Sequence, residues 1–126
     1  MIHGIGVDIA DTARFRRFLD EDNRTLLDRL FTAAEQEYCC SAQGAADRFA
    51  ARFAAKEAFL KALGTGLRDG LSWHDMEIVN DGAGRPSFTL SGRALQLCSE
   101  RGVTNHLLSL SHDGGSAVAM VVLEGP

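Results

Sequence analysis

The segment RFAAKEAFLKALGTG, residues 52–66, has the side chains and the spacing to bind a phosphorylated ligand together with a divalent cation. Glu57, Lys61 and Gly64 stand at positions i, i+4 and i+7, so they share one face of a helix. A carboxylate can bind the cation, and a lysine can neutralise a phosphate. The Gly-Thr-Gly turn at 64–66 can bring backbone N–H groups close to an anion, because two of its residues have no Cβ.

The same two charges could instead form a simple i,i+4 ion pair on a solvated face, which stabilises a helix by about 0.2 to 0.5 kcal/mol. However, the apolar residues of the helix predicted over 45–63 are spread around its circumference, a pattern typical of a buried helix. Charges in a buried helix need compensation. A hard cation needs more than one carboxylate, so the metal hypothesis predicts a second acidic residue elsewhere in the chain.

The strand predicted over residues 2–8, IHGIGVD, supplies that second candidate. Gly4 and Gly6 alternate with apolar residues along it, and glycines inside a strand indicate that another backbone or a ligand approaches closely. Asp8 is placed at the end of this strand, where ligand-binding carboxylates are often displayed. Its other possible role is to cap the next helix, although Asp11 is better placed for that.

Three arginines, Arg14, Arg16 and Arg17, form the densest positive patch of the sequence. They lie in an amphipathic helix predicted over residues 12–22. Such a cluster can simply be the solvent-exposed face of the helix, and this explanation is as good as a functional one. The functional alternative is the docking of an acidic partner, because local positive charge speeds association and sets orientation.

The composition narrows the class of protein. A chain of 126 residues corresponds to one domain, residues 1–126. The net charge of −4 argues against general nucleic-acid binding. No apolar run approaches the roughly 20 residues of a membrane span. Three cysteines, two of them adjacent, suit neither a disulfide framework nor a zinc site, which predicts a reduced, cytoplasmic protein.

The remaining patterns predict a single α+β domain with a mostly antiparallel sheet packed against the long central helix. A capping box at Thr32 and Glu35 starts one of the helices. His112 ends a strand in the segment SLSHD, beside a glycine-rich turn. A histidine in that place is usually a surface residue, but it can also donate to a phosphate or contact ring nitrogens. The predicted helices cover 12–22, 24–30, 33–40, 45–63 and 91–102, and the later strands cover 76–79, 87–90, 106–113 and 117–124.

Four segments, in this order and within this length, resemble the holo-acyl-carrier-protein synthases, the small single-domain class of phosphopantetheinyl transferases. The combination of GIGVD with RFAAKEAFLKA is highly specific, and the resemblance covers almost the whole chain. It implies a Mg²⁺-dependent transfer of 4′-phosphopantetheine from coenzyme A to a serine of apo acyl carrier protein, releasing adenosine 3′,5′-bisphosphate, in fatty acid biosynthesis. The segments are GIGVDI (4–9), RFAAKEAFLKALGTG (52–66), SWHDMEIVNDGAGRPSFTLSG (72–92) and SLSHD (109–113).

The resemblance also implies a role for each candidate residue. Asp8 and Glu57 bind the metal, and Glu57 takes the proton of the serine directly or through a metal-bound water. Lys61 contacts the phosphate under attack. Arg14 faces the acidic carrier protein. The other contacts with coenzyme A come from Arg52, Gly64, Thr65, Gly66 and His112.

Family members form trimers with sites shared between subunits, so the resemblance implies a homotrimer here. Two departures from the family pattern, Ala51 and the pair Asp47–Arg48, leave open any coenzyme A contact from that turn. On the residues alone, two other functions stay open. A non-catalytic nucleotide-binding module does not need two carboxylates aimed at one cation. A docking protein for an acidic partner, built on Arg14 to Arg17, is indifferent to Mg²⁺. The carrier could also belong to a polyketide or peptide synthase.

Overall fold

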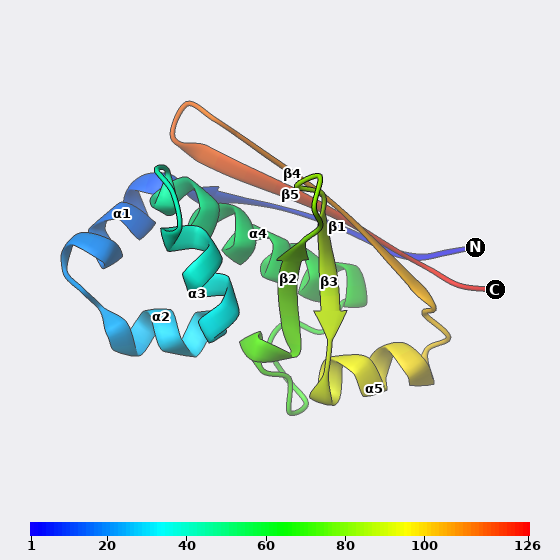
Figure 1. Cartoon of the computed structure of the whole chain (residues 1–126). Coiled ribbons are helices and arrows are strands. Elements are labelled where there is room, and N and C mark those ends of the chain that lie inside the picture. The colour runs from blue at the N-terminus through cyan, green and yellow to red at the C-terminus, as the bar shows by residue number, and fades with distance from the viewer.

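The computed structural model describes all residues, Met1–Pro126, which fold around one long helix, α4 (Ala45–Leu63). Helix α4 lies against one face of a three-stranded antiparallel sheet, as Figure 1 shows. The strand order of this sheet is β1 (Ile2–Asp11), β5 (Ser116–Glu124) and β4 (Asn105–Asp113). A second sheet is the hairpin of β2 (Met76–Asn80) and β3 (Pro86–Leu90). The predicted α+β architecture is confirmed.

Five short helical segments surround this core. Helices α1 (Thr12–Asp20), α2 (Arg24–Leu30) and α3 (Ala33–Cys40) gather near the N-terminal end of α4, whereas α5 (Gly92–Glu100) lies near its C-terminal end (Figure 1). A 3₁₀ turn, η1 (Trp73–Asp75), precedes β2. The predicted capping box at the start of α3 is confirmed, because Glu35 N donates to Thr32 Oγ1 and Thr32 N donates to Glu35 Oε1. None of the helices is both long enough and apolar enough to cross a bilayer.

Strand β1 rests directly on the backbone of α4. A Cβ at Gly4 would overlap the carbonyl oxygen of Ala62, and a Cβ at Gly6 would overlap that of Ala58. The prediction that another backbone approaches these glycines is therefore confirmed, and the partner is the central helix. This contact also places Asp8, which follows on the same face of β1, beside α4.

Strand β1 is longer than predicted, because its pairing with β5 continues as far as Asp11 opposite Ser116. Asp8 consequently lies inside the strand and not at its end. Asp11 caps α1 by accepting a hydrogen bond from Ala13 N at 3.0 Å, as the sequence favoured. Helix α1 ends at Asp20, two residues earlier than predicted.

The outer face of the three-stranded sheet is apolar and exposed in the single chain. Ile5, Val7 and Ile9 of β1 are each about 60% exposed, and Met120 of β5 lies in register with Val7. Leu107 of β4 is also exposed. The inner face of the same sheet carries glycine, alanine and other apolar residues, which pack on α4.

Candidate active site

Lys61 and Asp8 form the centre of the candidate site. Lys61 Nζ donates to Asp8 Oδ1 at 2.9 Å and to the carbonyl oxygen of Val7 at 3.1 Å. The lysine comes from the last turn of α4, and the carboxylate comes from the strand at the edge of the sheet. Asp8 is largely buried, whereas the side chain of Lys61 is 55% exposed. The hydrogen bond to Asp8, followed by the charge of Asp8, raises the pKa of Lys61.

Glu57 lies one turn before Lys61 on α4 but has no ion-pair partner within 4 Å. The simple i,i+4 pair of Glu57 with Lys61 is therefore not formed. Partial burial, and then the negative charge of Asp8, raises the pKa of Glu57. Lys61 and Arg14 act in the opposite direction. The structure thus brings the two predicted carboxylates close enough to repel each other, with Lys61 between the strand and the helix.

Two neighbouring carboxylates that repel each other are a suitable ligand set for a hard divalent cation. No group of three or more His, Cys, Asp or Glu side chains with metal-binding geometry occurs in the chain. A cation at Asp8 and Glu57 would therefore take its other ligands from water and from a phosphorylated substrate, as Mg²⁺ commonly does. An open pocket of about 390 Å³ adjoins this place and is lined by Val7, Asp8, Ile9, Lys61 and Val118.

Arg52 and His112 meet in a different pocket, of about 300 Å³. Arg52 is only 3% exposed, its guanidinium lies 4.2 Å from the centre of the Tyr38 ring, and its Nη2 donates to Asn80 Oδ1. The buried Nε of Arg52 has no hydrogen-bond partner. Because the guanidinium of Arg52 is charged and one of its buried donors is unpaired, this pocket favours a ligand that is anionic or rich in hydrogen-bond acceptors.

The two pockets lie on opposite sides of α4. Arg52 and Glu57 are five residues apart, which places them roughly 140° apart around a helix. Asp8 belongs to β1 and His112 to β4, and these are the two outer strands of the sheet. One chain therefore brings Asp8, Glu57 and Lys61 together, and it brings Arg52 and His112 together, but it does not combine the two sets.

The Gly-Thr-Gly turn corrects one sequence-based expectation. The N–H groups of Gly64 and Thr65 donate to carbonyl groups in the last turns of α4, at 2.9 to 3.3 Å. A helix C-terminus carries partial negative charge, and here Arg101 Nη1 caps it by donating to Leu63 O at 2.6 Å. The N–H groups of Gly64 and Thr65 are therefore occupied within the chain and not turned to an anion. Contacts of Gly64, Thr65 and Gly66 with coenzyme A stay predictions.

Arg14 of α1 lies next to an apolar pocket of about 480 Å³, whose lining also includes Leu67, just after this turn. Its guanidinium lies 5.2 Å from the centre of the Phe53 ring. The pocket combines positive charge with apolar walls, and its lining comprises Arg14, Leu26, Arg29, Leu30, Phe53, Leu67, Leu71, Ser72 and Trp73.

Sequence reasoning missed a buried ion pair. Lys56 Nζ and Glu35 Oε1 are 2.7 Å apart, and both side chains are fully buried. Two signals in the sequence pointed to it. Lys56 falls on the inner side of a helix predicted to be buried, and Glu35 is the acidic member of the capping box. Their pairing depends on how α3 packs on α4, which the local pattern does not contain.

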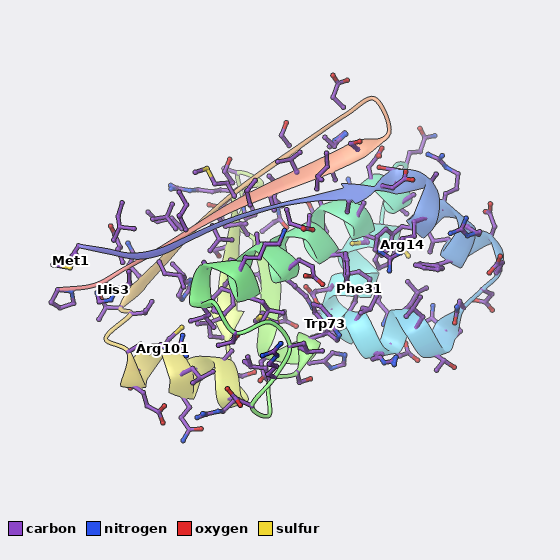
Figure 2. The ribbon with its side chains drawn as sticks, turned by 180° about the vertical axis from the view of Figure 1, so that it is seen from behind. Met1, His3, Arg14, Phe31, Trp73 and Arg101 are labelled. Atoms are coloured by element: carbon purple, nitrogen blue, oxygen red, sulfur yellow. The ribbon has the colours of Figure 1, made fainter.

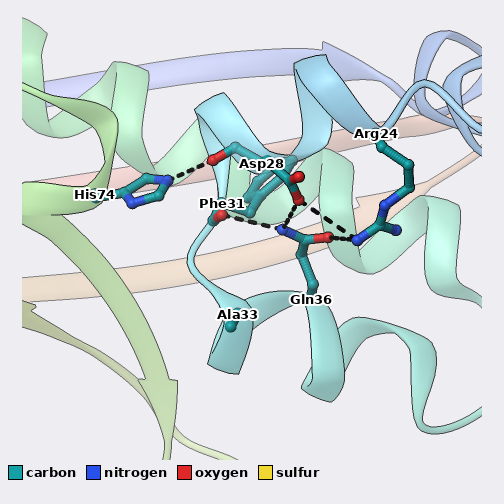
Figure 3. A pocket seen from close by; sticks show the side chains of 6 residues that line it. All are labelled: Arg24, Asp28, Phe31, Ala33, Gln36 and His74. Carbon is teal, nitrogen blue, oxygen red and sulfur yellow. Dashed lines mark hydrogen bonds and ion pairs between the residues drawn. The ribbon is translucent and has the colours of Figure 1, made fainter.

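A further surface pocket, between α2 and α3, contains none of the predicted site residues (Figure 3). Its polar groups already bind one another. Arg24 donates to Gln36, Gln36 donates to Asp28, and the ring of His74 contacts the carbonyl oxygen of Asp28. This internal network holds the two helices together, so the pocket is not a candidate active site.

Known proteins resemble the chain over almost its full length. The sequence profile of the 4′-phosphopantetheinyl transferase superfamily matches residues 4–121. A holo-[acyl-carrier-protein] synthase of Trichlorobacter lovleyi is 63% identical, with 100% of both chains covered. The crystal structure of the Neisseria meningitidis holo-[acyl-carrier-protein] synthase has a TM-score of 0.87 and 37% identity, covering 98% of this chain and 99% of that one. A Bacillus anthracis synthase solved with CoA (3′,5′-ADP) has a TM-score of 0.81 and 36% identity, covering 100% and 99%.

Proposed function

Because the chain belongs to the holo-[acyl-carrier-protein] synthases of the 4′-phosphopantetheinyl transferase superfamily, we propose that it moves 4′-phosphopantetheine from coenzyme A to a serine of apo acyl carrier protein. One observation in the structure carries this proposal. Asp8 of β1, which the resemblance assigns to a metal, accepts a hydrogen bond from Lys61 of α4, and Glu57 lies one turn before Lys61 with its pKa raised in part by the charge of Asp8. The Bacillus anthracis relative was solved with CoA (3′,5′-ADP), which supports the same substrate here.

In this reaction the serine oxygen forms a bond to the β-phosphorus of coenzyme A, and the bond from that phosphorus to the leaving group breaks. Adenosine 3′,5′-bisphosphate leaves with the electron pair. Asp8 and Glu57 would hold a Mg²⁺ ion, which would supply charge neutralisation at the diphosphate. Lys61 turns from Asp8 to the phosphate, where its charge stabilises the transition state. Glu57 accepts the serine proton, directly or through a metal-bound water.

The pocket of Arg52 and His112 accepts the nucleotide end of coenzyme A, but from a neighbouring copy of the chain. A single chain holds this pocket and the Asp8–Glu57 carboxylates on opposite sides of α4. The exposed apolar face of the sheet supplies a surface on which copies can associate. We therefore favour a homotrimer in which each active site is shared between two subunits, as the family resemblance implies.

Arg14 and the adjoining apolar pocket bind the acidic carrier protein. The net charge of the chain is −4, so the attraction must be local. The three free cysteines support a reduced, cytoplasmic setting, and the carrier of fatty acid biosynthesis is the expected partner.

Mass spectrometry of the carrier protein tests the proposal. After incubation of the chain with coenzyme A, Mg²⁺ and apo acyl carrier protein, the carrier should gain one phosphopantetheine unit. Asp8→Asn and Glu57→Gln should abolish the gain while circular dichroism stays unchanged. Glu37→Gln, which alters an exposed carboxylate, is the matched control.

Two results would contradict the proposal. If the wild-type protein leaves a correctly folded carrier unmodified, the transferase hypothesis is wrong. The nucleotide-binding and docking alternatives would then remain. A Glu57→Gln variant with normal activity at limiting Mg²⁺ would remove the metal assignment.

A further inference from the structure

Lys56 uses all three protons of its ammonium group inside the protein. Its Nζ donates to Glu35 Oε1 at 2.7 Å, to Leu30 O at 2.7 Å and to Trp73 O at 3.0 Å. The Nζ also lies 5.3 Å from the centre of the Phe31 ring. The lysine of α4 thus holds the last residue of α2 and the first residue of η1 by their backbones.

Glu35 completes the connection from the other side. Its Oε1 accepts from Thr32 N at 2.9 Å, and its Oε2 accepts from Ile78 N of β2 at 3.0 Å. A second hydrogen bond also joins the start of α3 to β2, because Thr32 Oγ1 donates to Glu77 Oε2 at 2.6 Å. The pair therefore joins α2, α3, α4, η1 and β2 through one fully buried point.

The backbone groups that Lys56 holds belong to the pocket beside Arg14. Leu30 and Trp73 both line this pocket, and the Trp73 ring lies 5.4 Å from that of Phe53, on which Arg14 stacks. Figure 2 shows Phe31 and Trp73 beside α2. Lys56 and Glu35 form no hydrogen bond with any of Asp8, Lys61 or His112.

Burying two charges costs desolvation energy, and an apolar pair of similar volume often stabilises a core as well or better. Stability alone therefore does not explain charged groups at this point. What the charges add is direction, since Lys56 ties two backbone groups of the pocket wall, Leu30 O and Trp73 O, and Glu35 fixes the position of Lys56.

We propose that Lys56 and Glu35 are positioning residues for carrier-protein recognition, because they set the relative placement of Leu30 and Trp73 in the pocket beside Arg14. This inference rests on the proposed function, and it adds two residues that touch neither substrate. It predicts an effect on the carrier that is separate from the effect on coenzyme A.

The test compares Glu35→Gln and the double variant Lys56→Met/Glu35→Gln with the wild type. In folded protein we expect the KM for the apo carrier to rise about tenfold in the double variant and less in the single one, while the KM for coenzyme A changes less than about twofold. Trp73 is the only tryptophan of the chain, so its emission maximum and acrylamide quenching report the pocket wall without any activity measurement. Its emission should shift to longer wavelength.

The matched control is Glu100→Gln, which removes the acidic partner of a partly exposed ion pair of α5 and should leave both KM values and the Trp73 emission unchanged. The inference is overturned if the folded variants keep the wild-type KM for the carrier, or if the KM for coenzyme A rises equally. If the double variant does not fold, the KM values and the Trp73 emission of Glu35→Gln alone test the inference. A wild type that does not transfer at all contradicts the proposed function instead, and Trp73 emission still shows whether the pair positions the pocket.

Discussion

Lys61 of α4 donates a hydrogen bond to Asp8 of β1 at 2.9 Å, although 53 residues separate them in the sequence. The ammonium group of Lys61 therefore neutralises the charge of Asp8 in the position where a metal cation could do so. Glu57 is left without a counter-ion. In the proposed reaction Lys61 exchanges Asp8 for a phosphate oxygen, and its half-exposed side chain leaves room for this movement. This exchange is the basis of the first prediction.

Lys61→Ala should slow the chemical step more than it weakens the binding of coenzyme A. Loss of one group that stabilises the transition-state charge typically reduces kcat by about 100-fold or more. Single-turnover kinetics with saturating coenzyme A separate the two effects. Arg68→Ala, which removes an exposed positive charge from the loop after the Gly-Thr-Gly turn, is the control. A variant with normal single-turnover rates but a raised KM would show that Lys61 only binds the substrate.

Glu57→Gln should make the metal-free protein more stable at neutral pH. Burial raises the pKa of Glu57, so in the window above its ordinary value of 4.5 the folded state holds a proton that the unfolded state has lost. The wild type consequently loses stability as pH rises through this window, whereas the glutamine variant does not. Urea unfolding in EDTA at several pH values measures the difference, which should disappear well below pH 4.5. Equal stability of both proteins at pH 7.5 would mean that Glu57 is not destabilised by its surroundings.

A mixture of two inactive variants should recover activity if each site is shared between subunits. Asp8→Asn removes a residue of one half-site, and His112→Glu places negative charge in the other. After dissociation and random reassociation of equal amounts, about a quarter of the sites combine the two intact halves. The mass gain of the carrier per unit time reports the recovery. Separately refolded variants mixed without dissociation are the control, and a mixture no more active than this control would place the whole site in one chain.

Gly6→Ala should destabilise the protein by about 3 kcal/mol, because the added methyl group would overlap the carbonyl oxygen of Ala58 and push β1 away from α4. Urea denaturation measures the change in the free energy of unfolding. Gly82→Ala is a matched control, since a Cβ there meets no atom within 4 Å. Equal stability of the two variants would show that β1 shifts on α4 at no cost. Transfer should also fall in Gly6→Ala, because β1 carries Asp8.

Arg14→Glu should raise the KM for the apo carrier by about tenfold with little change in the KM for coenzyme A, since it reverses a charge that faces an acidic partner. Arg16→Glu makes the same change of charge on the same helix, but Arg16 does not line the apolar pocket. Steady-state kinetics at two salt concentrations distinguish a local contact from general attraction. Equal effects of the two variants would point to the net charge of α1 and not to a docking pocket.

Local patterns in the sequence were sufficient to predict much of this protein. The apolar residues around 45–63 predicted a buried helix, the glycines of β1 predicted a close backbone, and Thr32 with Glu35 predicted a capping box. Each of these features depends on neighbours within a few residues, on side-chain periodicity or on the absence of a Cβ. The identities of Asp8, Glu57 and Lys61, and the family they suggest, were equally readable from the sequence.

Only the tertiary structure decided which charges meet. It paired Lys61 with Asp8 and not with Glu57, and it buried Lys56 against Glu35. It used the N–H groups of Gly64 and Thr65 to cap α4. It also placed Arg52 and His112 in a pocket separate from that of Asp8 and Lys61. These outcomes depend on the register of β1 with β5 and on how the helices and the sheet pack on α4. Such long-range geometry brings together residues dozens of positions apart, and no local pattern of side chains specifies it.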